Sequence, residues 1–165
     1  MTPVQVPSGH RRRLGSNPVW SLIGRAVYQQ PGVVIPSRPV RVFLSHSQRD
    51  RWIARQIDRH LRESGGVETF LDENDIQGGD RITDAVRAGL VACDEFVVIL
   101  SAASVGSDWV KAEIGGAWIL QKRIIIVLDK LSPRDIPQIV SDYKAFDLND
   151  IERYLEEVRS RLRSP

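Results

Sequence analysis

The chain has 165 residues, a formal net charge of +2 and one cysteine. This length predicts one domain with its own core, alone or with an arm. The single cysteine excludes an internal disulfide and favours a reducing compartment. No apolar run approaches the roughly 20 residues that span a bilayer, and no signal-peptide pattern is found near residue 1. We therefore expect a cytoplasmic protein without a membrane span.

The net charge hides an asymmetry between two parts of the chain. Residues 1–49 carry seven arginines and no acid, whereas the remaining residues carry 16 basic and 21 acidic side chains. We divide the chain into a basic, proline-containing arm, residues 1–38, and an α/β domain, residues 39–165. Within the arm, the apolar residues of positions 19–30 fit one face of a short helix. A mobile tail, a helix packed on its own domain, a surface for anionic lipid or nucleic acid, and a targeting sequence all stay open as interpretations.

Strand and helix patterns alternate from residue 40 onward. Strands are predicted at residues 40–44, 67–71, 96–100 and 124–128, with a weaker one at 143–148. Apolar residues at helical spacing predict helices at residues 50–63, 81–92, 109–122 and 151–162. Two of the strands, 96–100 and 124–128, are apolar on both faces, which is typical of a parallel sheet covered by helices. The order predicts a doubly wound parallel sheet with helices on both faces.

Such sheets bind ligands in the crevice outside the carboxyl ends of the strands. We expect residues 45–47, 72–80 and 101–108 to lie at that edge. No phosphate-binding loop and no dinucleotide fingerprint follows a strand, and the histidines and the cysteine lack metal-ligand spacing. A serine–histidine hydrolase is disfavoured, because Ser45 and His46 are neighbours that point to opposite faces of a strand. We therefore predict neither a metal site nor a bound cofactor.

Trp109 and Glu113 are the remaining candidates for chemistry. They follow a buried strand and enter a helix for which Ser107 or Asp108 is a plausible N-cap. Because they are four residues apart, they share one helical face, about one turn apart. This arrangement puts an aromatic plate beside a carboxylate near the crevice. The structural alternatives are a solvated Glu113 and a Trp109 that only anchors the helix to the sheet.

Several short sequence pieces occur in a characteristic order. They are residues 42–47, residues 70–72, Ile76 with residues 78–82, residues 98–101, Ser104, Ser107, Trp109 and Glu113. Together they resemble a TIR domain of the type common in bacterial proteins, over roughly residues 39–163. Val110 departs from the pattern, since many members have a cysteine there. The resemblance implies a flavodoxin-like, five-stranded parallel sheet.

The resemblance also implies a function. Some TIR domains are NAD⁺ glycohydrolases or ADP-ribosyl cyclases that cleave the nicotinamide–ribose bond, many in bacterial antiphage defence, and others are non-catalytic interaction modules. A nucleoside deoxyribosyltransferase-like enzyme on the same fold is a weaker alternative. For an enzyme, the resemblance implies NAD⁺ as substrate, a homo-oligomer through the loop at residues 72–82, and a separate sensor or effector protein. Glu113 would be catalytic, and the substrate contacts would come from Trp109, Phe43, Ser45, Asp75 and Gly78.

Overall fold

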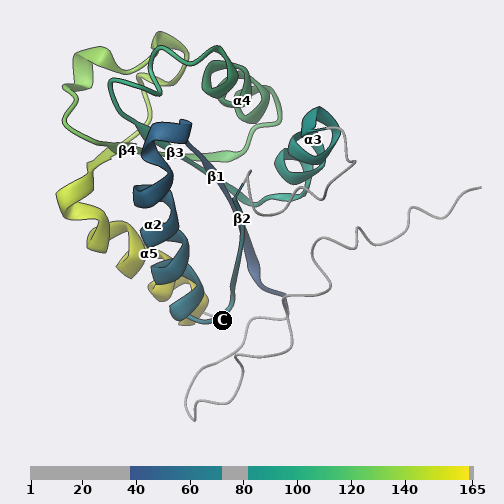
Figure 1. The fold of residues 1–165 in the computed structure, drawn as a ribbon. Coiled ribbons are helices and arrows are strands. Elements are labelled where there is room, and N and C mark those ends of the chain that lie inside the picture. Colours follow the sequence, from purple (N-terminus) through teal and green to yellow (C-terminus); the bar gives the residue numbers. More distant parts are fainter. Residues whose placement is uncertain (1–37, 72–81, 164–165) are drawn as a thin grey trace, which may run out of the picture.

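A five-stranded parallel sheet forms the centre of the computed structural model, which describes residues 38–71 and 82–163 (Figure 1). The spatial order of the strands is β2-β1-β3-β4-β5. The chain thus builds outward from β1 in one direction and then from β3 in the other, which confirms the predicted doubly wound, flavodoxin-like arrangement. The strands are β1 (Val40–Ser45), β2 (Val67–Leu71), β3 (Glu95–Leu100), β4 (Arg123–Leu128) and β5 (Ala145–Asp147).

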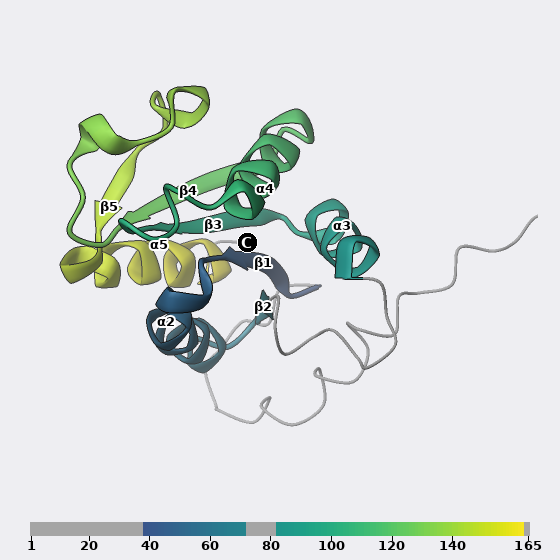
Figure 2. The same cartoon turned by 45° about the horizontal axis from the view of Figure 1, so that its top comes forward.

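Two helices cover each face of the sheet (Figures 1 and 2). Helices α2 (Arg51–Glu63) and α5 (Ile151–Arg163) pack on one face, and α3 (Ile82–Ala92) and α4 (Asp108–Ile119) pack on the other. The alternation of side chains along β1 separates the two cores. Phe43 joins the cluster under α3 and α4, whereas Val42 and Leu44 join the cluster under α2 and α5. Ser45, two residues after Phe43, therefore points to the face covered by α3 and α4.

The end of α4 differs from the sequence prediction. Helix α4 ends at Ile119, three residues early, because Gln121 adopts a left-handed conformation with φ +52° and turns the chain toward β4. The connection between β4 and β5, for which the sequence predicts no helix, contains two short 3₁₀ turns, Pro133–Asp135 and Gln138–Val140. Gly65 and Gly66, both with positive φ, follow α2 and end it.

Some predictions fall on residues that the structure does not describe. These are the basic arm up to residue 37, with its predicted helix at residues 19–30, and residues 72–81 of the loop before α3. Arg38, the first described residue, makes two hydrogen bonds of 2.9 and 2.8 Å to the carboxylate of Asp94, which precedes β3. Within residues 38–71 and 82–163, no helix has the length and apolar character needed to cross a membrane.

Helix α3 lies close to a stack of three aromatic rings on the sheet. The strand register places Phe43 opposite both Phe70 and Phe96, and the ring centroids are 5.0 and 5.6 Å from that of Phe43. Gly89 of α3 rests on these rings. A Cβ atom at this position would lie 3.1 Å from ring carbons of Phe43 and Phe70. The missing side chain at Gly89 therefore allows the helix to approach the sheet.

Gly89→Ala should destabilise the domain, because its methyl group must displace aromatic rings that already stack on one another on the sheet. A matched control is Gly115→Ala in α4, where a Cβ would have no atom within 4 Å and where alanine favours the helix. We expect Gly89→Ala to have a free energy of unfolding about 1–3 kcal/mol below that of Gly115→Ala. Denaturant unfolding of the two variants measures this difference. Equal stabilities would contradict the close approach of α3.

Cys93 is a buried core residue between α3 and β3. Its Sγ donates to the carbonyl oxygen of Leu90 at 3.2 Å. Burial raises the pKa of the Cys93 thiol from 9.0 to about 11, against a smaller opposite effect of Lys122. The neutral thiol is therefore the dominant form over the physiological pH range.

The raised pKa predicts slow alkylation of Cys93 in the folded protein. Only the thiolate reacts, so a rise from 9.0 to about 11 lowers the reactive fraction near neutral pH about 100-fold. We expect iodoacetamide to label the native protein at least that much more slowly than the denatured protein, and the native rate to keep rising up to about pH 11. Mass spectrometry of the labelled fraction over time gives both rates. Equal rates in the two states would contradict this prediction.

Candidate active site

Glu113 lies on the second turn of α4 and is only 3 % exposed. Ser45, the last residue of β1, is 1 % exposed, and its hydroxyl donates to Oε2 of Glu113 in a buried hydrogen bond. Helix α4 begins as the sequence indicated, since Ser107 caps it by accepting from the N–H of Val110 at 3.3 Å. The end of one strand thus holds a carboxylate on the helix above it.

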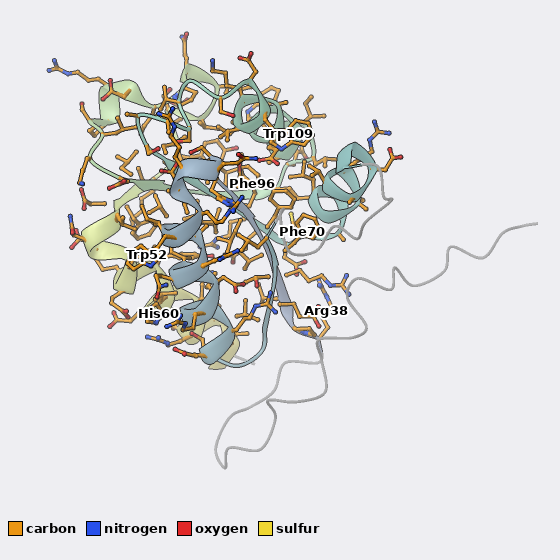
Figure 3. The ribbon with its side chains drawn as sticks, in the orientation of Figure 1. Arg38, Trp52, His60, Phe70, Phe96 and Trp109 are labelled. Carbon is orange, nitrogen blue, oxygen red and sulfur yellow. The ribbon has the colours of Figure 1, made fainter. Side chains whose placement is uncertain are left out.

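A groove of about 340 Å³ runs between α3 and α4. Glu113 and Trp109 both line it, which agrees with their predicted position on one helical face. The other lining residues of α4 are Ala112, Gly116 and Ile119, followed by Leu120, and α3 contributes Val86, Arg87 and Leu90. Trp109 is 39 % exposed and stands on α4 above the aromatic rings of the sheet (Figure 3). The groove therefore combines a buried carboxylate, an accessible aromatic side chain and a largely apolar lining.

The groove lies elsewhere than the sequence indicated. The loops after β1 and β3 do meet at the carboxyl edge of the sheet, where Ser47 and Ser101 each donate to Oδ2 of Asp50 at 2.7 Å. A hollow of about 320 Å³ at this edge is lined by residues of these loops and of the turn after β4. Trp109 and Glu113 are not among its lining residues. The pair faces the interhelical groove instead, because these positions lie on the side of α4 that is turned toward α3.

The structure places the other predicted site residues differently. Phe43 is fully buried between Phe70 and Phe96 and is not among the residues that line the groove, so in this structure it packs under the site, and its substrate contact stays a prediction. Ser45 is also buried and does not line the groove, and its contact with the site is the hydrogen bond to Glu113. Asp75 and Gly78 lie outside the described residues, as does nearly all of the loop at residues 72–82.

The structure adds Arg87 to the groove, a residue that the sequence reasoning did not single out. An exposed arginine on an amphipathic helix is common and carries no motif. Arg87 lies beside Val86 and three residues before Leu90, at the edge of the apolar stripe of α3. This position is the sequence feature that indicates a place near the groove.

The family model described as "TIR domain" matches residues 42–162. A curated relative from Brachypodium distachyon, the "Probable 2' cyclic ADP-D-ribose synthase BdTIR", is 28 % identical over 117 residues. The match covers 68 % of this chain and 52 % of the relative, so the chain spans about half the length of that relative.

Solved structures share the fold at low sequence identity. The TIR domain of the Toll-related receptor TRR-2 from Hydra magnipapillata has a TM-score of 0.62 and 16 % identity, with 74 % of this chain and 98 % of that chain covered. A TIR-STING receptor from C. gigas has a TM-score of 0.63 and 22 % identity, with 78 % and 43 % covered. The CMP N-glycosidase BcmB of Clostridium botulinum has a TM-score of 0.53 and 22 % identity, with 73 % and 98 % covered. With the family model matched from β1 to the last turns of α5, this chain belongs to the TIR domain family.

Proposed function

We propose that this TIR domain cleaves the nicotinamide–ribose bond of NAD⁺ and that Glu113 is its catalytic residue. The observation that carries the proposal is the buried Glu113 carboxylate, which Ser45 holds in a groove beside Trp109. The relative from Brachypodium distachyon supports it, because its name describes a synthase of a cyclic ADP-ribose. That product contains the ADP-ribose unit that NAD⁺ retains when nicotinamide leaves.

The proposed reaction needs little acid–base chemistry. The bond between the ribose C1′ and the pyridinium nitrogen breaks, its electron pair stays on nitrogen, and nicotinamide leaves as a neutral molecule. Positive charge then develops on the ribose, as in other glycosyl transfers. Water adds to C1′ and releases a proton to the solvent to give ADP-ribose, or a hydroxyl group of the same molecule adds to C1′, releases its proton to the solvent and gives a cyclic isomer. No general acid is required at the leaving group.

The residues of the groove fit the charge that this reaction creates. A carboxylate fixed in place before the reaction stabilises a developing cation without reorganisation, and the hydrogen bond from Ser45 supplies that fixation for Glu113. The apolar lining lowers the local dielectric constant and strengthens the attraction between carboxylate and cation. Trp109 offers a flat wall against which the nicotinamide or the ribose can pack.

The proposal extends to the loop and to the biological setting. Asp75 and Gly78 would add substrate contacts from the loop at residues 72–82, and the same loop would join subunits of a homo-oligomer. The enzyme would use NAD⁺ as substrate, without a cofactor, and would signal in antiphage defence together with a separate sensor or effector protein. These points rest on the family resemblance.

Glu113→Gln tests the catalytic role, because it removes the negative charge and nearly keeps the shape. We expect kcat/KM for NAD⁺ to fall at least about 100-fold, comparable to the loss of one electrostatic stabiliser in other active sites. Chromatography with mass spectrometry follows NAD⁺ loss and identifies the product at high protein concentration. Glu63→Gln, at an exposed position of α2, is the matched control. If wild type leaves NAD⁺ intact even under crowding, the proposed activity fails and an interaction module becomes the better interpretation.

Ser45→Ala tests whether the hydroxyl positions the carboxylate. We expect kcat to fall about 10- to 100-fold with little change in KM, since a buried hydrogen bond to a charged group contributes roughly 1.5–3 kcal/mol. Ser45→Thr retains a hydroxyl at the end of a strand and should recover part of the rate. Steady-state kinetics of wild type and the two variants measure kcat and KM, and thermal unfolding checks that each protein is folded. Together they separate a loss of positioning from a loss of folded protein. Equal kcat values for Ser45→Ala and wild type would exclude a positioning role.

A further inference from the structure

The groove between α3 and α4 holds two opposite charges. Among the described residues that line it, Glu113 and Arg87 are the only charged side chains, and they come from facing helices. Glu113 is buried, whereas Arg87 is exposed. The carboxylate therefore lies deep in the groove and the guanidinium lies at its rim.

Arg87 is a cation without a structural partner in the described part of the chain. Some other arginines are paired with carboxylates, as Arg38 is with Asp94 and Arg62 is with Asp58, at 2.8 Å each. Arg87 makes no ion pair or hydrogen bond with any residue in the ranges 38–71 and 82–163. Its charge is thus available to a ligand that enters the groove.

The size of the groove limits how much of a dinucleotide it can enclose. A volume of about 340 Å³ is near the lower end of small-molecule sites, which run from roughly 300 to 1,000 Å³. The nicotinamide and its ribose would fill such a space, and the rest of the dinucleotide would extend out of the groove past its rim. The first group beyond this ribose is a phosphate on its 5′ oxygen. An anion therefore follows the reacting sugar at the distance of one ribose.

We propose that Arg87 binds this 5′-phosphate and makes the site selective for phosphorylated nicotinamide ribosides. This inference rests on the proposed function and names the substrate feature that the same groove recognises. The planar guanidinium donates two parallel N–H groups to a phosphate, which gives strong and oriented binding. Arg87 would hold the phosphate at the rim, and Trp109 would pack beside the nicotinamide and ribose rings of the ligand. The ribose C1′ is then directed toward Glu113.

Binding measurements test the proposal without turnover. The full chain carrying Glu113→Gln is titrated calorimetrically with nicotinamide mononucleotide, which has the phosphate, and with nicotinamide riboside, which lacks it. We expect the mononucleotide to bind about 10- to 100-fold more tightly, as one or two charge-assisted hydrogen bonds predict. Adding Arg87→Gln should reduce that ratio to near one, and Arg87→Lys should keep part of it as a point charge. Arg59→Gln, on the exposed side of α2, is the matched control and should leave the ratio unchanged.

The outcomes separate this inference from the proposed function when wild type is assayed with NAD⁺ in parallel. NAD⁺ cleavage together with a ratio that Arg87→Gln leaves unchanged overturns the role of Arg87 and keeps the catalytic role of Glu113. A ratio that falls with Arg87→Gln, in a protein that leaves NAD⁺ intact, supports the phosphate contact and overturns the activity. Failure of both compounds to bind, or equal affinities in the Glu113→Gln parent, also overturns the role of Arg87.

Discussion

A carboxylate removed from water needs a hydrogen-bond donor, and Ser45 is such a donor to Glu113. This bond links the end of β1 to the second turn of α4 and so fixes the rotation of the helix about its own axis. With Glu113 turned toward Ser45, Ile114 packs in the core. Trp109 is then left at the groove. One buried polar contact therefore sets both the packing of α4 and the surface that it presents.

The sheet separates this site from a second hydrophobic core, which lies on the opposite face of the sheet under α2 and α5. There, buried Glu95 at the start of β3 accepts a hydrogen bond of 2.9 Å from the hydroxyl of Tyr154 and another from Arg161, both on α5. Burial, together with the nearby Glu95 carboxylate, raises the pKa of Tyr154 well above its usual range, so the hydroxyl keeps its proton. Two of the buried glutamates thus serve different faces of the sheet: Glu95 connects α5 to the sheet, and Glu113 lies in the groove.

The periodicity of the sequence accounts for how well the elements were predicted. Strands 67–71 and 124–128 agree with β2 and β4 to within one residue, because glycine or charged residues flank each segment in the sequence. The same periodicity placed Trp109 and Glu113 on one face of a helix. It also gave β1 two distinct faces, although it did not show which helices would cover each of them.

What sequence patterns did not predict depends on contacts between distant elements. Phe43 was expected in the site, but its exposure depends on how closely α3 approaches, and the missing side chain at Gly89 permits that approach. The groove itself forms only where α3 and α4 lie side by side, so no local pattern encodes it. Arg87 is not predicted from the sequence for the same reason, since its place in the site depends on Glu113 of the facing helix.

The position of Trp109 has an optical consequence. It is the tryptophan among the described groove residues, whereas Trp52 is 72 % exposed on α2, on the opposite face of the sheet (Figure 3). Indole fluorescence responds to the polarity of its surroundings and to rings that stack on it. Emission from Trp109 therefore reports what lies beside Glu113, while Trp52 and Trp118 are exposed, do not line the groove and add a background from solvent-exposed indoles. The domain carries its own optical reporter of groove occupancy, with no need for an attached dye.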